Sequence, residues 1–192
     1  MFERWRAPRG GDLLPVPRGF ARLPDGARRW VWAFALDAAP VTNGAFRAFM
    51  AATGCARPPW MSRPGFDDPE QPVVGVTLAE ARAFARWARK RLPTRAEWWR
   101  AVGADGPPWG RGSPEPTQAI FRRPAGAAPA PRANRPASPY GHADLHGNVW
   151  EWGDDGICRG GFWGSPSLEA ARLELVTPAE TRSAGIGLRC AR

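Results

Sequence analysis

The apolar positions of the first half of the chain begin with one strand-like segment. Residues 30–36, WVWAFAL, form a short, continuous run of apolar and aromatic side chains, and Asp37 and Pro40 close it. A short apolar run bounded by turn-forming residues is typical of a strand buried on both faces. We therefore expect one buried strand over residues 30–36.

Helical spacing follows directly after this strand. Thr42 or Asn43 can cap the start of a helix, and Gly54 can end it. The apolar residues between them recur every three to four positions, as one face of a helix requires. The expected buried face consists of Phe46, Phe49 and Met50.

Two further helices share a start signal, a threonine followed three residues later by a glutamate. The pairs are Thr77 with Glu80 and Thr94 with Glu97, an arrangement in which each side chain can cap the other residue's backbone amide. Pro93 is expected to end the first of these helices. The second is expected to be short and to pass through Trp98, Trp99 and Val102.

The remaining segments predict loops and one small sheet. Residues 55–72 are rich in proline, and residues 103–139 contain Gly, Pro, Ala and Arg with almost no large apolar side chain, so both are expected to be loops, the second long and on the surface. Apolar segments near 149–152, 157–163 and 186–192 are typical of strands. We predict an α+β fold with little regular secondary structure and a single domain over the whole chain.

The composition agrees with a loop-rich fold that has an aromatic core. The 192 residues are 43% hydrophobic and include 11 Trp, 22 Gly and 22 Pro, enough apolar residues for one core. No apolar run approaches the ~18 residues of a membrane span. The start, MFERWRAPRG, is charged where a signal peptide needs apolar residues. We therefore expect a cytoplasmic protein.

The formal net charge of +9 would suit an acidic partner such as a nucleic acid. All but one of the 27 basic residues are arginine, and they are spread along the chain. Together with the high Ala, Pro and Gly content, this bias is typical of a GC-rich genome, and the scarcity of Asn and Gln favours a thermophile. We therefore expect no nucleic-acid partner.

The cysteines and histidines do not form a recognisable reactive or metal site. Cys55, Cys158 and Cys190 have neither an even count nor zinc spacing. A disulfide between Cys158 and Cys190 is geometrically feasible if their segments are neighbouring strands, but two buried free thiols are favoured in a cytosolic protein. His142 and His146 each neighbour a glycine and are expected to be polar loop residues.

Six motifs follow one another between residues 40 and 191: PVTNGAFRAFMAATG, PVVGVTLAEARAFARWARKRLPTRAEWWRAV, PWG, SPYGHADLHGNVWEW, RGGFW and GIGLRCA. In this order they resemble the formylglycine-generating enzyme and sulfatase-modifying factor family. The resemblance implies a C-type-lectin-like fold, which agrees with the pattern above. One departure is LPTRAEWW, where the family usually has an acidic residue after the threonine and another between the aromatic residues.

The resemblance does not extend to the residues that make the family's enzymes active. Formylglycine-making members are similar in having two redox cysteines shortly after the RGG-x-W strand, where a thiolate can bind copper. The corresponding span here, GSPSLEAARLELV, has no cysteine. The iron-dependent sulfoxide synthases use a His-rich helical domain fused ahead of this one, and we expect no such domain here. We expect no enzyme, no catalytic residue and no required cofactor; the alternative is a divergent oxidoreductase of the same superfamily.

A structural calcium ion is the one cofactor that the resemblance leaves open. In the similar enzymes, the stretch corresponding to DLHGNVWEW wraps calcium with carboxylates at its ends and main-chain carbonyls between them. Carried over to this chain, Asp144 and Glu151 would supply carboxylates, and Gly147 and Val149 would supply carbonyls. The competing interpretation is a tight turn whose tryptophans fill the core and whose polar side chains satisfy backbone groups.

The C-terminal region, residues 159–192, has strict ends and a middle without a period. It is similar to the variable proteins of diversity-generating retroelements, in which a fixed skeleton carries residues diversified from asparagine codons. The matching frame residues are Arg159, Gly160, Gly161, Trp163, Arg172, Pro178, Arg182, Ile186, Gly187, Leu188 and Arg189. The residues between them that such codons can produce are Phe162, Gly164, Ser165, Pro166, Ser167, Leu168, Leu173, Leu175, Val176, Thr177, Ser183, Ala184 and Gly185.

This similarity implies a non-enzymatic display and binding protein. Its ligand is expected to be a variable protein or another macromolecule, contacted by a mixture of apolar and small polar side chains. Glu169, Glu174 and Glu180 cannot be produced from such codons, so we expect them to be constant. A retroelement of this kind also points to a prophage, and hence to a cytoplasmic or phage-associated location. The other interpretation is that these are ordinary loop residues of a divergent family member.

Overall fold

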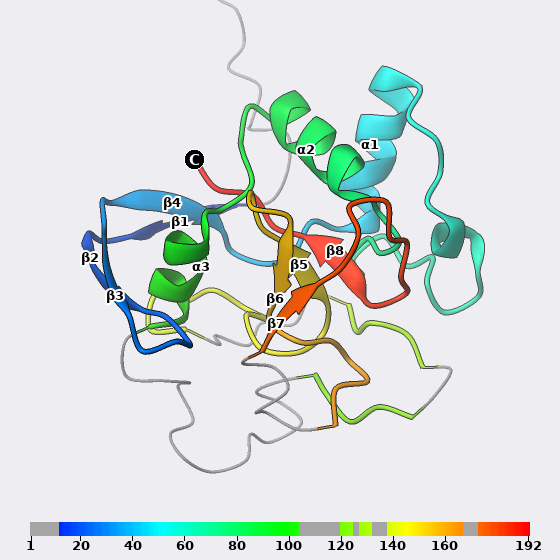
Figure 1. Cartoon of the computed structure of the whole chain (residues 1–192). Coiled ribbons are helices and arrows are strands. Elements are labelled where there is room, and N and C mark those ends of the chain that lie inside the picture. Colours follow the sequence, from blue (N-terminus) through cyan, green and yellow to red (C-terminus); the bar gives the residue numbers. More distant parts are fainter. Residues whose placement is uncertain (1–11, 104–119, 125–126, 132–137, 167–172) are drawn as a thin grey trace, which may run out of the picture.

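The structure is a computed structural model of the chain, and it describes residues 12–103, 120–124, 127–131, 138–166 and 173–192 (Figure 1). Several predicted features lie outside the described residues: most of the 103–139 loop, Ser167, Leu168, Glu169 and Arg172.

Four short strands near the N-terminus form two antiparallel pairs. β1 (Leu13–Val16) pairs with β4 (Phe34–Asp37), and β2 (Gly19–Arg22) pairs with β3 (Arg28–Val31). The C-terminal residue joins the first pair, because the backbones of Ala35 and Arg192 exchange two hydrogen bonds of 2.9 and 2.8 Å.

The predicted single buried strand over residues 30–36 was therefore wrong. The chain leaves β3 after Val31 and enters a different sheet at Phe34, and the two tryptophans of the run, Trp30 and Trp32, are exposed. An unbroken apolar run does not reveal a change of strand partner, since each strand's partner comes from another part of the chain.

The three predicted helices are confirmed: α1 (Asn43–Thr53), α2 (Leu78–Trp87) and α3 (Arg95–Val102). Thr42, not Asn43, caps α1 through its side chain, and both predicted capping boxes are formed. α2 ends at Trp87, earlier than predicted from Pro93. The predicted loop 55–72 contains one short 3₁₀ helix, η1 (Pro59–Ser62).

A four-stranded sheet occupies the centre of the molecule, as the C-terminal motifs predicted. Its strands are β5 (Trp150–Trp152), β6 (Ile157–Arg159), β7 (Glu174–Val176) and β8 (Ile186–Leu188). Their spatial order is β7-β6-β5-β8, with β5 and β8 parallel and the other pairs antiparallel. Within the part of the chain that the structure describes, β7 is therefore an edge strand.

Two hydrophobic clusters hold these elements together. The first joins α1 and α2 to β5, β6 and β8, and its rings include Phe46 stacked on Phe84 at 5.6 Å. The second packs α3 against the N-terminal strands around Trp98 and Leu36. Among the described residues, no helix is long and apolar enough to cross a membrane. The α+β prediction is confirmed.

Candidate functional site

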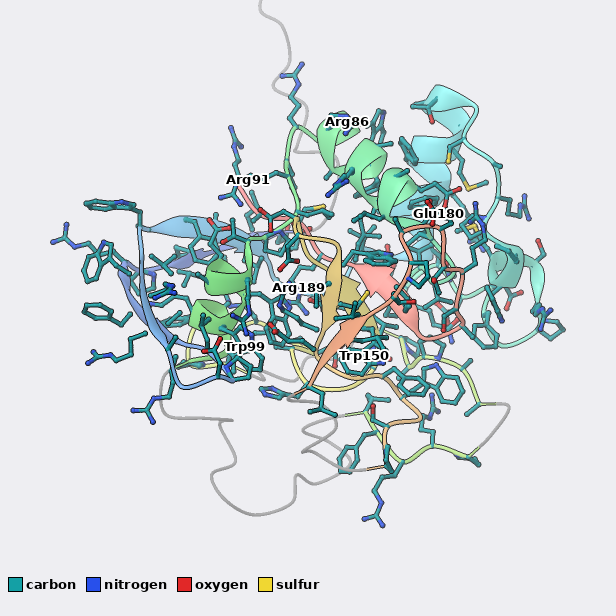
Figure 2. The ribbon with its side chains drawn as sticks, viewed as in Figure 1. Arg86, Arg91, Trp99, Trp150, Glu180 and Arg189 are labelled. Carbon is teal, nitrogen blue, oxygen red and sulfur yellow. The ribbon has the colours of Figure 1, made fainter. Side chains whose placement is uncertain are left out.

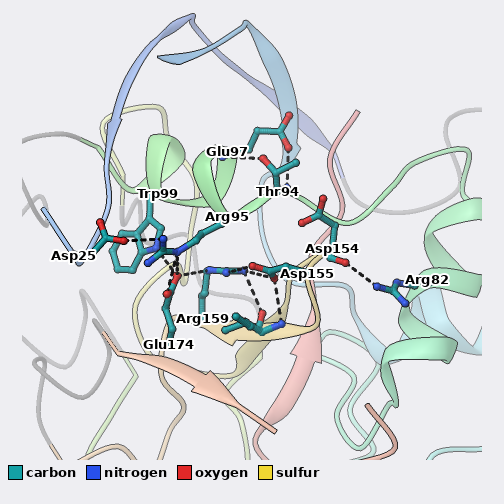
Figure 3. Close-up of polar contacts among 11 residues, drawn as sticks. Asp25, Arg82, Thr94, Arg95, Glu97, Trp99, Asp154, Asp155, Arg159 and Glu174 are labelled. Atoms are coloured by element: carbon teal, nitrogen blue, oxygen red, sulfur yellow. Dashed lines mark hydrogen bonds and ion pairs between the residues drawn. The ribbon is translucent and has the colours of Figure 1, made fainter. Parts of the chain in front are cut away.

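Arg159 fixes the start of the C-terminal region from inside the protein. It ends β6, its side chain is fully buried, and its guanidinium donates to both carboxylate oxygens of Asp155 and to Oε1 of Glu174 at 2.8 Å (Figure 3). Because a planar guanidinium bound on two sides has little rotational freedom, β6 and β7 are held in one register.

Glu174 is the point where this network reaches α3. Arg95 donates to Glu174 at 2.8 and 3.0 Å, and the Trp99 ring nitrogen donates at 3.1 Å (Figure 3). Burial alone would raise the pKa of the Glu174 carboxyl, but the hydrogen bonds from its three donors outweigh that cost and lower the pKa to about 2. Glu174 is thus a carboxylate held in place by donors from α3 and β6.

Arg189 fixes the other end of the region. Its fully buried guanidinium forms an ion pair with Glu151 at 2.8 Å and donates to the carbonyls of Asp37 and Ala143 at 3.0 and 2.6 Å. Trp98 donates to the second oxygen of Glu151 at 2.9 Å. A buried ion pair is tolerated only when its remaining donors and acceptors are satisfied, and here they are.

Arg182 connects the loop between β7 and β8 to α2. It donates to the carbonyl of Gly75 at 2.8 Å and to both carboxylate oxygens of Glu80 at 2.9 and 2.6 Å. Glu80 is also the acidic member of the α2 capping box. One carboxylate therefore stabilises a helix start and the loop that precedes β8.

Glycine is required at frame positions where the backbone passes close to other groups. Gly160 and Gly161 both have positive φ, at 103° and 76°, a region that L side chains rarely adopt. Gly187 lies so close to β-strand neighbours that a Cβ there would stand 2.5 Å from the carbonyl oxygen of Val73. These three glycines fix the backbone path through β6 and β8.

Two predicted variable residues, one just before β7 and one at its end, are exposed to solvent. Leu173 is 63% exposed and Val176 is 79% exposed, whereas Leu175 between them packs against the first hydrophobic cluster. An edge strand also presents unpaired backbone groups on its open side. β7 thus offers both side chains and backbone to a ligand.

Phe162 gathers a second set of predicted variable residues. Its half-buried ring packs over Gly164 and Gly185, so that a Cβ at either glycine would lie 2.7 Å from the ring. Trp163, beside it, donates its ring nitrogen to the carbonyl of Ala184 at 3.4 Å. Positions 162, 164 and 185 are therefore coupled, because a larger residue at either glycine must move the ring.

Two of the predicted variable positions are not displayed. Ser165 is buried, and its hydroxyl accepts a hydrogen bond from the Phe162 amide at 2.9 Å, while Gly185 is buried under the Phe162 ring. The pattern of residue types did not reveal burial. The structure leaves Pro166, Leu173 and Val176 exposed, and it leaves part of the surface of Phe162, Gly164, Leu175, Thr177, Ser183 and Ala184 accessible.

The two carboxylates predicted to hold calcium have other partners, and Arg189, which lies beside the central sheet in Figure 2, is the partner of Glu151. Both oxygens of Glu151 accept hydrogen bonds from Arg189, and one also accepts from Trp98, so this carboxylate already has its counter-charge. Asp144 accepts from the Asn148 side chain at 3.3 Å. The geometry agrees better with the competing interpretation, a turn whose polar side chains satisfy their neighbours.

The three thiols are held in their neutral form. Cys158 and Cys190 are buried and not bridged to each other, and Cys55 is partly buried. Burial raises the pKa of each of these thiols, whereas a reactive cysteine needs a lowered pKa. The favoured prediction of free, buried thiols is confirmed for Cys158 and Cys190.

The two histidines lie in a loop, as predicted, and both are buried there. His142 lies 3.2 Å from the Ser138 hydroxyl, and burial together with the nearby Arg189 charge lowers its pKa to about 4. A neutral buried imidazole is a packing residue with a hydrogen bond.

Sequence reasoning missed Arg95, which links α3 to the C-terminal region. It bridges Asp25, at 2.9 Å, and Glu174. The signal was the departure in LPTRAEWW, because Arg95 is the residue after the threonine where the similar family usually has an acid. A reversed charge at one position indicates an acidic partner elsewhere, and here the partner is Glu174.

Comparisons with known proteins agree with this architecture. The family model for the sulfatase-modifying factor enzyme 1-like domain matches residues 13–192. Hercynine oxygenase of Mycolicibacterium smegmatis is 34% identical over 160 residues, which are 62% of this chain and 36% of that protein. The chain therefore spans only part of the length of that relative.

Two solved structures share the fold over nearly the whole chain. PvdO from Pseudomonas aeruginosa has a TM-score of 0.78 at 24% identity, covering 97% of this chain and 95% of that one. Treponema denticola variable protein 1 has a TM-score of 0.72 at 17% identity, covering 93% and 94%. The predicted C-type-lectin-like fold is confirmed.

Proposed function

Because this chain belongs to the family of sulfatase-modifying factor enzyme 1-like domains and shares its fold with a variable protein, we propose that it binds a ligand through its C-terminal region. The binding surface consists of the displayed positions Pro166, Leu173, Val176 and Ser183, with Phe162 at its partly buried side. The ligand is a protein or another macromolecule. In the finer form of the proposal, a retroelement diversifies these positions.

The observation that carries the proposal is the contrast along β7. Glu174 is held by three hydrogen-bond donors. By contrast, Leu173 just before it and Val176 two positions after it are exposed to solvent. An exposed apolar edge strand is a binding device, because it offers main-chain hydrogen bonds for affinity and side chains for specificity. A rigid strand also loses little entropy when a ligand binds.

The state of the thiols supports binding over thiolate chemistry. The copper-binding pair of the similar formylglycine-making enzymes has no counterpart in the span after RGG-x-W. The cysteines that the chain does have are protonated by burial.

A divergent oxidoreductase is the second candidate, favoured by the identity to hercynine oxygenase. Copper or iron retained through purification, together with oxygen consumption on a thiol substrate, would establish this activity and remove the non-enzymatic proposal. We expect neither.

A display library tests the binding proposal. Codons at Pro166, Leu173, Val176 and Ser183 are randomised, and the library is selected against two purified, unrelated proteins such as hen lysozyme and streptavidin. The matched control randomises four exposed positions on and just after α2: Ala79, Arg82, Arg86 and Arg89. We expect binders from the first library alone. Equal enrichment from both libraries, or binders from neither, would overturn the proposal.

A genomic comparison tests the finer form separately. The diversification proposal requires a nearby near-copy of the DNA encoding residues 159–192 that differs only where the copy has adenine, next to a reverse transcriptase gene. If the surrounding genome lacks this copy, diversification is wrong while the binding surface stands on the library result.

A further inference from the structure

The outer face of the β2–β3 hairpin carries a row of exposed aromatic rings between arginines. Phe20, Trp30 and Trp32 are 47%, 48% and 72% exposed. Phe20 and Trp30 are direct cross-strand partners, and so are Arg22 and Arg28. Alternation along a strand places these four side chains on one face. We call this face, with Trp32, the aromatic ribbon.

The fold holds the ribbon open to solvent. Ala21 and Val31, on the opposite face of the hairpin, are buried and belong to the cluster that packs against α3. Figure 1 shows the hairpin at one end of the molecule, with α3 between it and the central sheet that carries β7. The ribbon is therefore separate from the C-terminal binding surface and does not depend on its proposed function.

The rings form a continuous series. The ring centroids of Phe20 and Trp30 are 5.2 Å apart, and those of Trp30 and Trp32 are 6.1 Å apart, with interplanar angles of 76° and 90°. The Arg28 guanidinium lies 4.4 Å over the Phe20 ring. Edge-to-face contacts leave ring faces available to a further planar group.

The positive charges of the ribbon's arginines are not neutralised by ion pairs within the described part of the chain. Among the described residues, the ion pairs include none with Arg22 or Arg28. The nearest turn carboxylate, Asp25, is paired with Arg95 instead, and the Ala27 amide and Arg95 both lower its pKa. The net charge of +9 has the same sign. The ribbon thus complements an anionic ligand that also has flat apolar faces.

Contrary to the expectation from the charge distribution along the sequence, we propose that the aromatic ribbon binds single-stranded nucleic acid, with bases stacking on Trp30 and Trp32 and phosphates contacting Arg22 and Arg28. Stacking rings alternating with cations are the recognition pattern for an unpaired strand, in which every base has an exposed face. A duplex hides these faces, so an unpaired strand fits the ribbon better than a duplex does. The interaction is expected to be weakly dependent on base sequence.

Fluorescence anisotropy with a fluorescein-labelled oligo(dT) of roughly 16 nucleotides tests this proposal. The intact chain is titrated into the oligonucleotide at several salt concentrations. Trp32→Ala is expected to weaken binding about tenfold, and Trp32→Phe is expected to restore most of it, because a stacked base contributes about one to two tenfold steps of affinity. Arg28→Ala is expected to lower the salt dependence by about one unit of log–log slope.

The matched control is Arg86→Ala, an exposed arginine on α2, which is not expected to change binding. The proposal is overturned if oligo(dT) does not bind at low salt, or if Trp32→Ala binds as the wild-type chain does. It is also overturned if heparin or poly-glutamate shows the same Trp32 dependence as oligo(dT), because the ligand would then be a general polyanion or an acidic protein. Retained thermal unfolding temperatures show that each variant is folded.

Discussion

The C-terminal region contains two kinds of residue whose environments are opposite. Arg159 and Arg189 are fully buried with every described contact directed at a carboxylate or carbonyl, whereas Leu173 and Val176 extend into solvent from the edge strand β7. The buried set controls the backbone path, and the exposed set makes few contacts of its own. Stability and recognition are thus assigned to different side chains within one short stretch.

The difference teaches how one fold can carry a changeable surface. Substitutions at exposed positions away from special contacts usually change the free energy of unfolding by less than about 0.5 kcal/mol, whereas breaking a buried ion pair costs several. Three residues belong neither to the buried set nor to the exposed set, because their packing couples them: Phe162, Gly164 and Gly185.

Removing the buried cation should have the largest effect. Arg189→Met leaves Glu151 buried with Trp98 as its remaining described donor and leaves the carbonyls of Asp37 and Ala143 without theirs. We expect the free energy of unfolding, measured by urea denaturation, to fall by about 3–5 kcal/mol. The exposed cation substitution Arg86→Met should cost under about 0.5 kcal/mol. A similar loss for both variants would mean that the buried pair has no special role.

Filling the close approach at Gly187 should have a smaller but clear effect. The Cβ of Gly187→Ala would stand 2.5 Å from the Val73 carbonyl oxygen, so β8 or the segment around Val73 must shift. We expect a loss of about 1–3 kcal/mol in the same measurement. The control Ser183→Ala, four residues earlier and partly exposed, should change the free energy of unfolding little. If Gly187→Ala unfolds at the same urea concentration as the wild type, the backbone approach at Gly187 is not tight.

The carboxylate that ties β7 to α3 should show its effect in the pH dependence. The pKa of Glu174 is lowered to about 2 in the folded protein, so its contribution is present above the unfolded value near 4.3 and is lost as the pH falls from there toward 2. In Glu174→Gln, about 1 kcal/mol should be missing at neutral pH and this part of the acid dependence should disappear. Glu180→Gln, exposed in the same region, should keep the wild-type profile; identical profiles for both variants would contradict the network.

The parts of the fold that follow from local signals could be predicted. The starts of α2 and α3 were predicted because Thr77 and Thr94 each form a capping box with the glutamate three residues later. The segments VWEW, ICRGGFW and IGLRCAR were predicted as strands of one sheet because each is a short stretch dense in apolar residues. The strand partners could not be predicted, since pairing depends on residues elsewhere in the chain. For this reason the predicted single strand over residues 30–36 is in fact divided between two sheets.

The candidate site was predictable in outline and not in its contacts. The residue types of positions 162–185 indicated which side chains could be variable, but not that Ser165 is buried. The link from Arg95 to Glu174 crosses 79 positions, and no periodicity connects residues so far apart. That Glu174 is constant stays a prediction, and its three hydrogen-bond donors give a physical reason to expect it.

Protease resistance of two sequence libraries tests the central claim most directly. One library randomises the exposed positions Leu173 and Val176 with Pro166, and the other randomises the ion-paired positions Arg159, Glu174 and Arg189. Sequencing before and after a protease pulse measures the folded fraction of each, because cleavage follows the population of opened chains. The account predicts that most members of the first library survive and that few of the second do. Equal depletion of the two libraries would contradict it, because the frame and the displayed surface would then not be distinct.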